Sequence, residues 1–328
     1  MVRTVVLGAG APVHRHVRAL GAHADRCTLT GVHDADPAAA AELAGAFGLP
    51  VLDGLDAALD GADAAIVGGR LEDRPALTRG ALERGLDVLV EPPLAPAPDM
   101  AHGLLSAIVR APRRPVALVA YDDAYDPAVL QLRELVADQP LLGVDVERLD
   151  PAETGPTPEL DVVHDLMLQD LQLVLALCGQ PIAATQAAGR RVRRGGPVDH
   201  AQALLVLEDD VLVSLLASRA GAARVRRVTV STTQARVTAD LDARVVEAVR
   251  TTAAGAGRHE AVAQRVHVVP QDPTAVQAEA FLRCVERRTS PESSIGMAIA
   301  AQEAAVAILK RIELVAHRPA MRRGPQAA

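Results

Sequence analysis

Short apolar runs alternate with helical stretches over the first 120 residues, and this alternation most strongly restricts the possible fold. Such an alternation is typical of βαβ units and of a parallel sheet with helices on both faces. The expected strands are 4–7, 27–32, 51, 64–67, 88–90 and 116–120, and the expected helices are 13–20, 37–47, 55–59, 74–84 and 100–109. Residues 1–120 are therefore predicted to form a doubly wound α/β domain of the Rossmann type.

A glycine-rich turn follows the first expected strand. The run Gly8-Ala9-Gly10-Ala11-Pro12-Val13 lies between strand and helix, and the second strand ends near Asp34, at the spacing of the acidic residue that binds a ribose. Val13 replaces the third glycine of the dinucleotide-binding fingerprint. That glycine mainly permits close packing of helix on strand, so its loss is the most tolerable of the three. An ordinary βαβ turn with a helix-capping aspartate is the alternative.

After Tyr121 the pattern changes to apolar runs separated by turns such as Glu208-Asp209-Asp210, which predicts antiparallel strands. The expected strands are 142–148, 183–192, 201–207, 211–218, 225–231, 235–241 and 245–250, and the expected helices are 127–137, 274–287 and 295–315. Residues 121–316 are predicted to form an α+β domain with a large, mostly antiparallel open sheet. Residues 317–328 are expected to be a loose polar tail.

The stretch 160–179 is predicted to be a buried helix, because apolar residues cover most of its circumference and Gly179 follows as a stop signal. Four polar residues share one narrow stripe, which indicates a face toward a wet cleft or a polar network: Asp161, Asp165, Gln169 and Gln172. His164 and Asp170 lie off this stripe, where a hydrogen-bonded core residue is the expected role.

Composition excludes several classes of protein. The net charge of −7 does not favour a nucleic-acid or membrane binder, and no apolar stretch is long enough to span a bilayer. The three cysteines lie far apart without metal-ligand spacing, so no metal site is expected. Nothing in their pattern requires an oxidising compartment, so a cytoplasmic location is expected. Lys310 is the single lysine among 34 basic residues, so an amine with an adjustable pKa is available at one position only.

The chain resembles the Gfo/Idh/MocA oxidoreductases, which are related to glucose-fructose oxidoreductase and inositol dehydrogenase. The likeness runs almost end to end and is specific because its motifs occur in the same order. These motifs are Gly8-Ala9-Gly10 with His16, Val32-His33-Asp34, Val88-Leu89-Val90-Glu91 with Pro93, Tyr125-Asp126-Pro127, Asp161 through Asp165 to Asp170, Ala217-Ser218-Arg219, and Asp272-Pro273 with Glu279 and Phe281.

The resemblance implies NAD(P) binding by the first domain and hydride transfer to or from a sugar, cyclitol or related polyol over the open sheet. The implied cofactor-binding residues are Gly8, Ala9, Gly10, Pro12, Val13, Asp34, Gly68, Gly69, Arg70, Glu91 and Pro92. NAD(H) is expected over NADP(H), because Asp34 would repel a 2′-phosphate and no arginine follows it at positions 35 to 37.

The sequence departs from the family at its catalytic positions. The usual lysine of a Glu-Lys-Pro motif is Pro92, and the usual histidine of an Asp-x-x-x-His motif is Gln169, so only Asp165 of that trio remains. Neither Pro nor Gln can take up a proton at neutral pH. Further positions that are often acidic or histidine in the family are Gln172 and Arg74.

Oxidation of a carbinol needs a base for the hydroxyl proton. Asp165 could serve if burial raised its pKa. The catalytic candidates are Asp165, Gln169, His164 and Tyr121, and the substrate-binding candidates are Arg74, Asp161 and Gln172.

Three functions stay open: a redox enzyme with altered proton-transfer groups, a non-redox enzyme of specialised metabolism, and a catalytically silent NAD-binding subunit. The expected partners are a small-molecule substrate and further copies of the chain. A homodimer or homotetramer is expected through the outer face of the second sheet, because strands 201–207 and 211–218 carry apolar residues on both faces.

Overall fold

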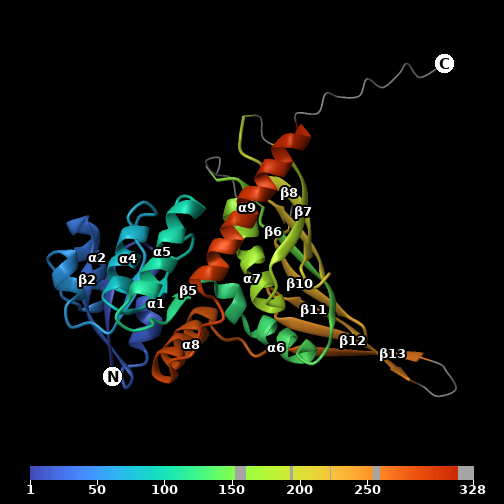
Figure 1. Cartoon of the computed structure of the whole chain (residues 1–328). Coiled ribbons are helices and arrows are strands. Elements are labelled where there is room, and N and C mark those ends of the chain that lie inside the picture. Colours follow the sequence, from blue (N-terminus) through green and yellow to red (C-terminus); the bar gives the residue numbers. More distant parts are fainter. Residues whose placement is uncertain (152–159, 193–194, 222, 254–258, 317–328) are drawn as a thin grey trace.

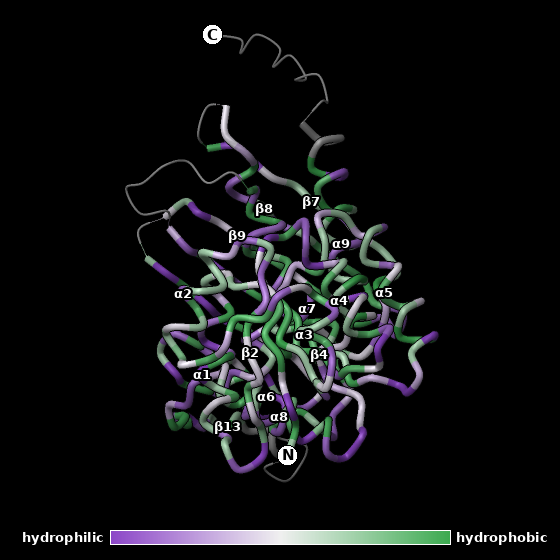
Figure 2. Tube along the Cα trace, turned by 90° about the vertical axis from the view of Figure 1, so that its left-hand side faces the viewer, coloured by the Kyte–Doolittle hydropathy of each residue, from purple (hydrophilic) through white to green (hydrophobic). Residues whose placement is uncertain are grey.

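Two β-sheets with helices between and around them make up the molecule (Figure 1). The computed structural model describes residues 1–151, 160–192, 195–221, 223–253 and 259–316. The predicted tail, 317–328, lies outside these described residues. Figure 2 shows apolar residues concentrated along the inner strands and polar residues along the outer loops.

The first sheet has five parallel strands in the order β2-β1-β3-β4-β5, which confirms the predicted doubly wound topology. Its strands are β1 (Val2–Leu7), β2 (Cys27–His33), β3 (Ala64–Val67), β4 (Asp87–Val90) and β5 (Ala117–Val119). Its helices are α1 (Val13–Gly21), α2 (Pro37–Phe47), α3 (Leu55–Leu59), α4 (Arg74–Glu83) and α5 (Pro98–Arg110). The strand predicted at Val51 is only an isolated bridge to Val32.

Three helices begin at an Asp-Pro pair, which explains why the sequence predicted their starts to within one residue. The side chain of Asp36 accepts a hydrogen bond from the Ala38 N–H at the start of α2. Asp126 caps α6 (Pro127–Val136) and Asp272 caps α8 (Pro273–Arg287) in the same way. Each proline at the first helical position has no N–H to leave unsatisfied, and each cap is worth about 1 kcal/mol.

Among the described residues, the second sheet has eight strands in the order β13-β12-β11-β10-β6-β9-β8-β7, and every pair is antiparallel except β6 with β9. Its strands are β6 (Leu141–Leu149), β7 (Ile182–Arg190), β8 (His200–Leu207), β9 (Leu212–Ser218), β10 (Val225–Thr232), β11 (Ala235–Asp240), β12 (Val245–Ala253) and β13 (His259–His267). Strand β13 was missed in the sequence, because residues 261–265 are exposed and show no buried alternation.

The predicted buried helix is present as α7 (Leu168–Cys178), but a π turn over Val163–Met167 precedes it. The Leu168 N–H donates to the Val163 carbonyl, five residues back. A π turn changes the angular position of every residue before it relative to those after it. The polar stripe expected from uniform α-helical winding therefore does not continue unbroken.

Helix α9 (Ile295–Ala316) joins the two sheets, because it packs on β7 and α7 on one side and on α5 on the other (Figure 1). Helix α8 returns to the first sheet, where Phe281 is fully buried in the cluster that also contains residues of α1. Because α8 and α9 come late in the chain but pack on elements of the first sheet, the two sheets with their helices do not correspond to two continuous residue ranges. The division at residue 120 stays a prediction.

Candidate active site

The glycine turn between β1 and α1 is packed tightly against the loop after β3. Gly8 has φ +86°, and a Cβ atom there would lie 2.6 Å from the Gly68 carbonyl carbon. Only glycine avoids both the left-handed strain and this collision. A Cβ on Gly68 would in turn meet the Val13 side chain at 2.1 Å. The valine that replaces the third fingerprint glycine is therefore accommodated by a glycine on the neighbouring loop.

Asp34 reaches this turn from the end of β2, as its spacing predicted. One carboxylate oxygen accepts the Ala9 N–H at 2.6 Å, and the other accepts the Asp36 N–H at 2.7 Å. A glycine-containing turn, the start of α1 and a carboxylate at the next strand end are the parts that a dinucleotide needs. The residues present therefore fit such a cofactor.

Glu91, at the end of β4, is anchored to α1. It is buried, and His16 Nε2 lies 2.6 Å from its carboxylate, with Arg15 at 3.4 Å. Burial alone would raise the pKa of Glu91, but the His16 contact and the Arg15 charge outweigh it and hold that pKa below its usual value. Arg15 also pairs with Asp122. These contacts fix the loop that carries Pro92.

A cleft of about 440 Å³ lies between the loop after β4 and the π turn with α7. It brings together residues that are far apart in the sequence: Pro92, Tyr121, His164, Asp165 and Gln169. The polar stripe on the inner helix, together with the family resemblance, predicts that Pro92, Tyr121, Asp165 and Gln169 meet in one cleft, and all four line it. Further wall residues include Leu71, Pro93, Leu160, Leu168, Gln302 and Val306.

Two buried polar atoms at the cleft have no hydrogen-bond partner among the described residues. These are the Tyr121 hydroxyl and the Gln302 side-chain carbonyl, whose amide donates to the Ala95 carbonyl at 3.0 Å. Burial raises the pKa of Tyr121, so its hydroxyl stays protonated at neutral pH. Unsatisfied buried polar groups are costly, so these two atoms are suited to contact a polar ligand.

Asp165 is neither buried nor free. Its side chain is 45% exposed, and Arg219 donates to it at 2.5 Å while also bonding the Leu160 carbonyl. The burial that would have adapted Asp165 as a base is absent. Arg219 lies in a motif of the family likeness, but the sequence alone did not indicate this ion pair.

Two of the predicted substrate-binding residues lie in the interior. Arg74 is buried and donates to the Pro93 carbonyl at 2.6 Å and to the Gly69 carbonyl at 3.0 Å. Gln172 is fully buried and donates to Ser293 at 3.2 Å. The structure thus gives both residues partners within the protein. Asp161 contacts the ring of His164, which lines the cleft.

Asp170 is a core residue, as predicted, whereas His164 is not. Asp170 is fully buried and accepts from Arg148 at 2.8 Å. Arg148 also binds Asp123, which binds Arg226, so two arginines and two carboxylates form one network. His164 is 36% exposed and lines the cleft. The π turn is the reason, because it rotates His164 away from its expected position.

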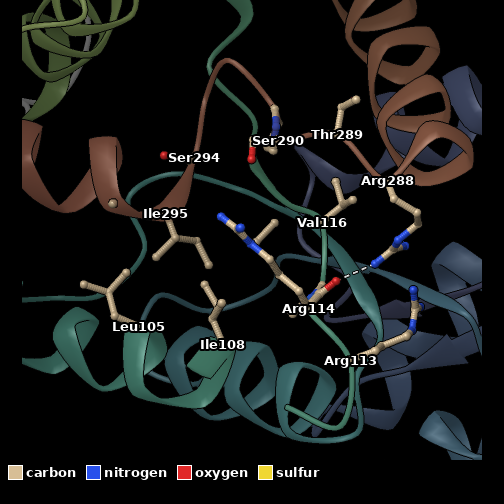
Figure 3. Close-up of a pocket in the computed structure, with 14 residues that line it drawn as sticks. Leu105, Ile108, Arg113, Arg114, Val116, Arg288, Thr289, Ser290, Ser294 and Ile295 are labelled. Atoms are coloured by element: carbon tan, nitrogen blue, oxygen red, sulfur yellow. Dashed lines mark hydrogen bonds between the residues drawn. The ribbon is translucent and has the colours of Figure 1, made fainter. Parts of the chain in front are cut away.

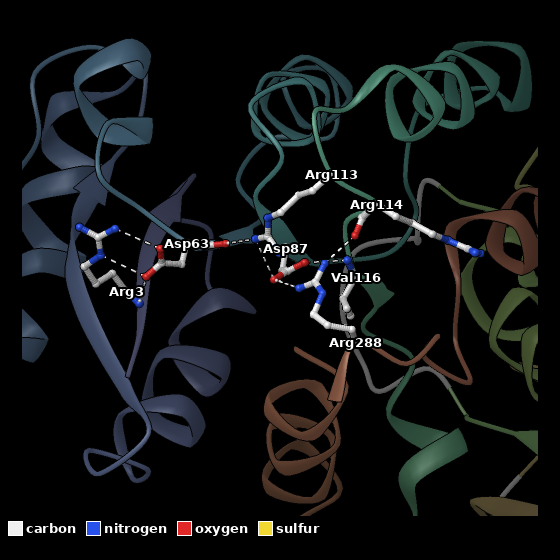
Figure 4. A network of polar contacts seen from close by, with 7 residues as sticks. All are labelled: Arg3, Asp63, Asp87, Arg113, Arg114, Val116 and Arg288. Carbon is white, nitrogen blue, oxygen red and sulfur yellow. Dashed lines mark hydrogen bonds and ion pairs between the residues drawn. The ribbon is translucent and has the colours of Figure 1, made fainter. Parts of the chain in front are cut away.

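A second hollow of about 470 Å³ lies at the amino-terminal side of the first sheet (Figure 3). Arg113 and Arg288, on its wall, both donate to the buried Asp87 carboxylate, which also accepts the Val116 N–H (Figure 4). This hollow is slightly larger than the cleft, but two of its three arginines, Arg113 and Arg288, bind a structural carboxylate. Ligands of parallel α/β sheets bind at the carboxyl ends of the strands, which favours the cleft.

These features define a class of protein: a Rossmann-type sheet with a dinucleotide-compatible turn, joined to an open antiparallel sheet. Residues 2–118 match the GFO/IDH/MocA family model, described as an oxidoreductase family with an NAD-binding Rossmann fold. The chain belongs to this Gfo/Idh/MocA family.

Named relatives agree with this assignment. The chain is 28% identical over 218 residues to a UDP-N-acetylglucosamine 3-dehydrogenase of Acidithiobacillus ferrooxidans, covering 66% of this chain and 67% of that protein. It is 30% identical over 224 residues to the myo-inositol dehydrogenase Hyg17 of Streptomyces leeuwenhoekii, covering 64% of this chain and 66% of that protein.

Solved structures share the whole fold. The A. ferrooxidans enzyme GnnA superposes with a TM-score of 0.85 at 24% identity, over 97% of this chain and 99% of that one. GenD2 from gentamicin A biosynthesis, solved in complex with NAD, superposes with a TM-score of 0.76 at 23% identity, over 95% of this chain and 94% of that one. No helix among the described residues is both long and apolar enough to cross a membrane.

Proposed function

We propose that the protein is an NAD-dependent oxidoreductase that acts on a carbinol carbon of a sugar, a cyclitol or a related small polar metabolite. The observation that carries this proposal is the continuous connection between the glycine turn and the cleft. Gly8 packs on Gly68 and Gly69, and Arg74 ties the Gly69 carbonyl to the Pro93 carbonyl at the cleft wall. A cofactor bound along the turn would thus reach the cleft.

NAD, when bound, supplies the hydride acceptor, and the chain supplies orientation and proton transfer. Asp34 is placed to accept hydrogen bonds from ribose hydroxyls, and its charge disfavours a 2′-phosphate. Ala35, Asp36 and Pro37 offer no cation for that phosphate. We therefore expect NAD(H) to bind more tightly than NADP(H).

The experiment measures binding and turnover separately. Calorimetry with NADH and NADPH should show at least tenfold tighter NADH binding, and Asp34→Ala should remove most of the difference. Turnover is then assayed at 340 nm with NAD⁺ and either myo-inositol or UDP-N-acetylglucosamine. Tighter binding of NADPH would contradict the cofactor assignment.

A second candidate follows from Pro92 and Gln169, which cannot transfer protons. A non-redox enzyme on this scaffold could keep the nucleotide site and lose the usual chemistry, whereas a catalytically silent subunit needs neither. NAD that stays bound through purification, with no change in absorbance for any polyol tested, would favour the non-redox enzyme. Failure to bind either nucleotide would favour a silent subunit.

A further inference from the structure

The π turn places His164 on the cleft side of the inner helix. In this turn an N–H reaches back five residues, as the bond from the Leu168 N–H to the Val163 carbonyl shows. Residues five apart, such as His164 and Gln169, are therefore brought to neighbouring positions on one face. Both line the cleft. His164 thus lies one turn before the position at which the family likeness expects a histidine.

Asp161 fixes the imidazole of His164. One Asp161 oxygen lies 2.9 Å from His164 Nδ1, and the other accepts the N–H groups of Val163 at 2.9 Å and His164 at 3.0 Å. Burial alone would raise the pKa of Asp161, but these hydrogen bonds outweigh it and hold the pKa below its usual value. Asp161 is thus a charged acceptor, so Nδ1 must carry the proton of the neutral ring. The lone pair of Nε2 is left available.

The other cleft residues are less suited to receive a proton. Asp165 is held by Arg219, whose side chain is only 6% exposed. Tyr121 stays protonated because burial raises its pKa. The side chains of Pro92 and Gln169 cannot take up or release a proton near neutral pH. Among the described residues that line the cleft, only His164 combines a titratable nitrogen, a carboxylate partner and exposure to the cleft.

We propose that His164, oriented by Asp161, is the acid/base residue that replaces the missing lysine and histidine of this family. In the oxidation, the carbinol O–H proton moves to His164 Nε2 while the C–H hydride leaves with its electron pair to bound NAD⁺, and the C–O bond becomes a carbonyl. In the reverse direction the same nitrogen returns the proton. Asp161 stabilises the imidazolium that forms. This inference rests on the proposed hydride-transfer function.

The charged and titratable groups around His164 set its environment. Asp161 bonds its ring, Asp165 follows it in the chain with its carboxylate on Arg219, and Tyr121, in neutral form, lines the same cleft. The carboxylate of Asp165 is thus already paired with a cation, Arg219. The carboxylate of Asp161 is therefore the one that bonds the ring of His164.

The first test reads the tautomer directly and needs no substrate. Long-range ¹H–¹⁵N correlation spectra of ¹⁵N-histidine protein should show Nδ1–H rings for His33 and His102, whose Nδ1 atoms lie 3.2 and 2.9 Å from backbone carbonyls. They should also show a further Nδ1–H ring, whose signal disappears in His164→Gln. In Asp161→Asn the same ring should shift toward the Nε2–H form that predominates in free histidine. A His164 ring that carries its neutral proton on Nε2 in the native protein would overturn the proposal.

The second test uses turnover of NAD⁺ with the polyol that gives the highest rate. His164→Gln should lower kcat/KM by about 10²–10⁴-fold, and Asp161→Asn by at least roughly tenfold through the wrong tautomer. NADH affinity should change by less than twofold in both. His267→Gln, on the exposed edge strand β13, is the matched control and should keep full activity.

The two proposals fail in different ways. Undiminished turnover in His164→Gln refutes the acid/base role and leaves the oxidoreductase function standing. Native protein that binds no nucleotide refutes the oxidoreductase function, and the acid/base role with it, even if the tautomer is as expected. A loss of turnover that accompanies a loss of NADH affinity or of helical circular dichroism would show a structural role for His164 and would likewise refute the proposal.

Discussion

Single buried residues give this protein a stability that depends on pH. Asp170 is fully buried, and desolvation raises its pKa to about 6 although Arg148 donates to it. An unfolded chain has an aspartate pKa of about 3.9, so the folded state holds this proton more tightly. The contribution of Asp170 to the free energy of unfolding is therefore fully present below about pH 4 and is lost as the pH rises through about 6.

Asp170→Asn should remove this dependence. The difference in unfolding free energy between native protein and variant should fall by on the order of 2–3 kcal/mol from pH 4 to pH 7. Urea unfolding of both proteins at intervals across this range measures it. A difference that stays constant with pH would contradict the prediction.

Gly8 and Gly48 separate backbone strain from steric collision. Both have positive φ, +86° and +65°, but a Cβ at Gly48 meets nothing within 4 Å, whereas one at Gly8 meets Gly68. Gly48→Ala should cost about 1–2 kcal/mol of stability and leave NADH affinity unchanged. Gly8→Ala should cost more and lower NADH affinity at least roughly tenfold, a factor that corresponds to about 1.4 kcal/mol. If calorimetry gave the same NADH affinity for Gly8→Ala and for the native protein, the turn would not bind the cofactor.

At the scale of elements, the loop after β4 and helix α7 supply the two altered catalytic positions. Pro92 and Gln169 line the same cleft, so Pro92→Lys and Gln169→His would place a lysine and a histidine on opposing walls. The double variant should raise polyol dehydrogenase activity, while each single variant should do little, because the two groups act as a unit. Initial rates at 340 nm for all four proteins test this, and an equal gain from one single change would argue against coupling.

At the scale of the whole molecule, one face of the second sheet has no cover among the described residues. Leu142, Leu204 and Leu212 are 52%, 57% and 61% exposed there, on neighbouring strands, and border a shallow groove of about 560 Å³. Helices α6, α7 and α9 pack on the other side of the sheet. Exposed apolar patches of this kind favour association. We predict a homodimer or homotetramer through this face.

Replacing Leu204 and Leu212 together by glutamate should convert the protein to a monomer by light scattering at micromolar concentration. The control is Val109→Glu on α5, where an isolated valine is 85% exposed and outside this face. That variant should keep the native mass. A native protein that is already monomeric would exclude the predicted assembly.

The sequence determined the elements whose cause is local. Alternating apolar runs set the strands of both sheets, and Asp-Pro pairs set the starts of α2, α6 and α8. The spacing from the glycine turn to Asp34 placed a carboxylate where the Ala9 N–H now binds it. It missed β13, because an exposed edge strand need not show a buried alternation.

Only the tertiary structure decided the chemistry around the inner helix. Uniform winding predicted Gln172 on the cleft stripe and His164 in the core, whereas the π turn and packing against Ser293 reverse the two. The ion pair of Asp165 with Arg219 joins residues that no local pattern connects. Propensity acts over a few neighbouring residues, while burial, ion pairing and the rotation of a helix depend on partners brought together by the fold.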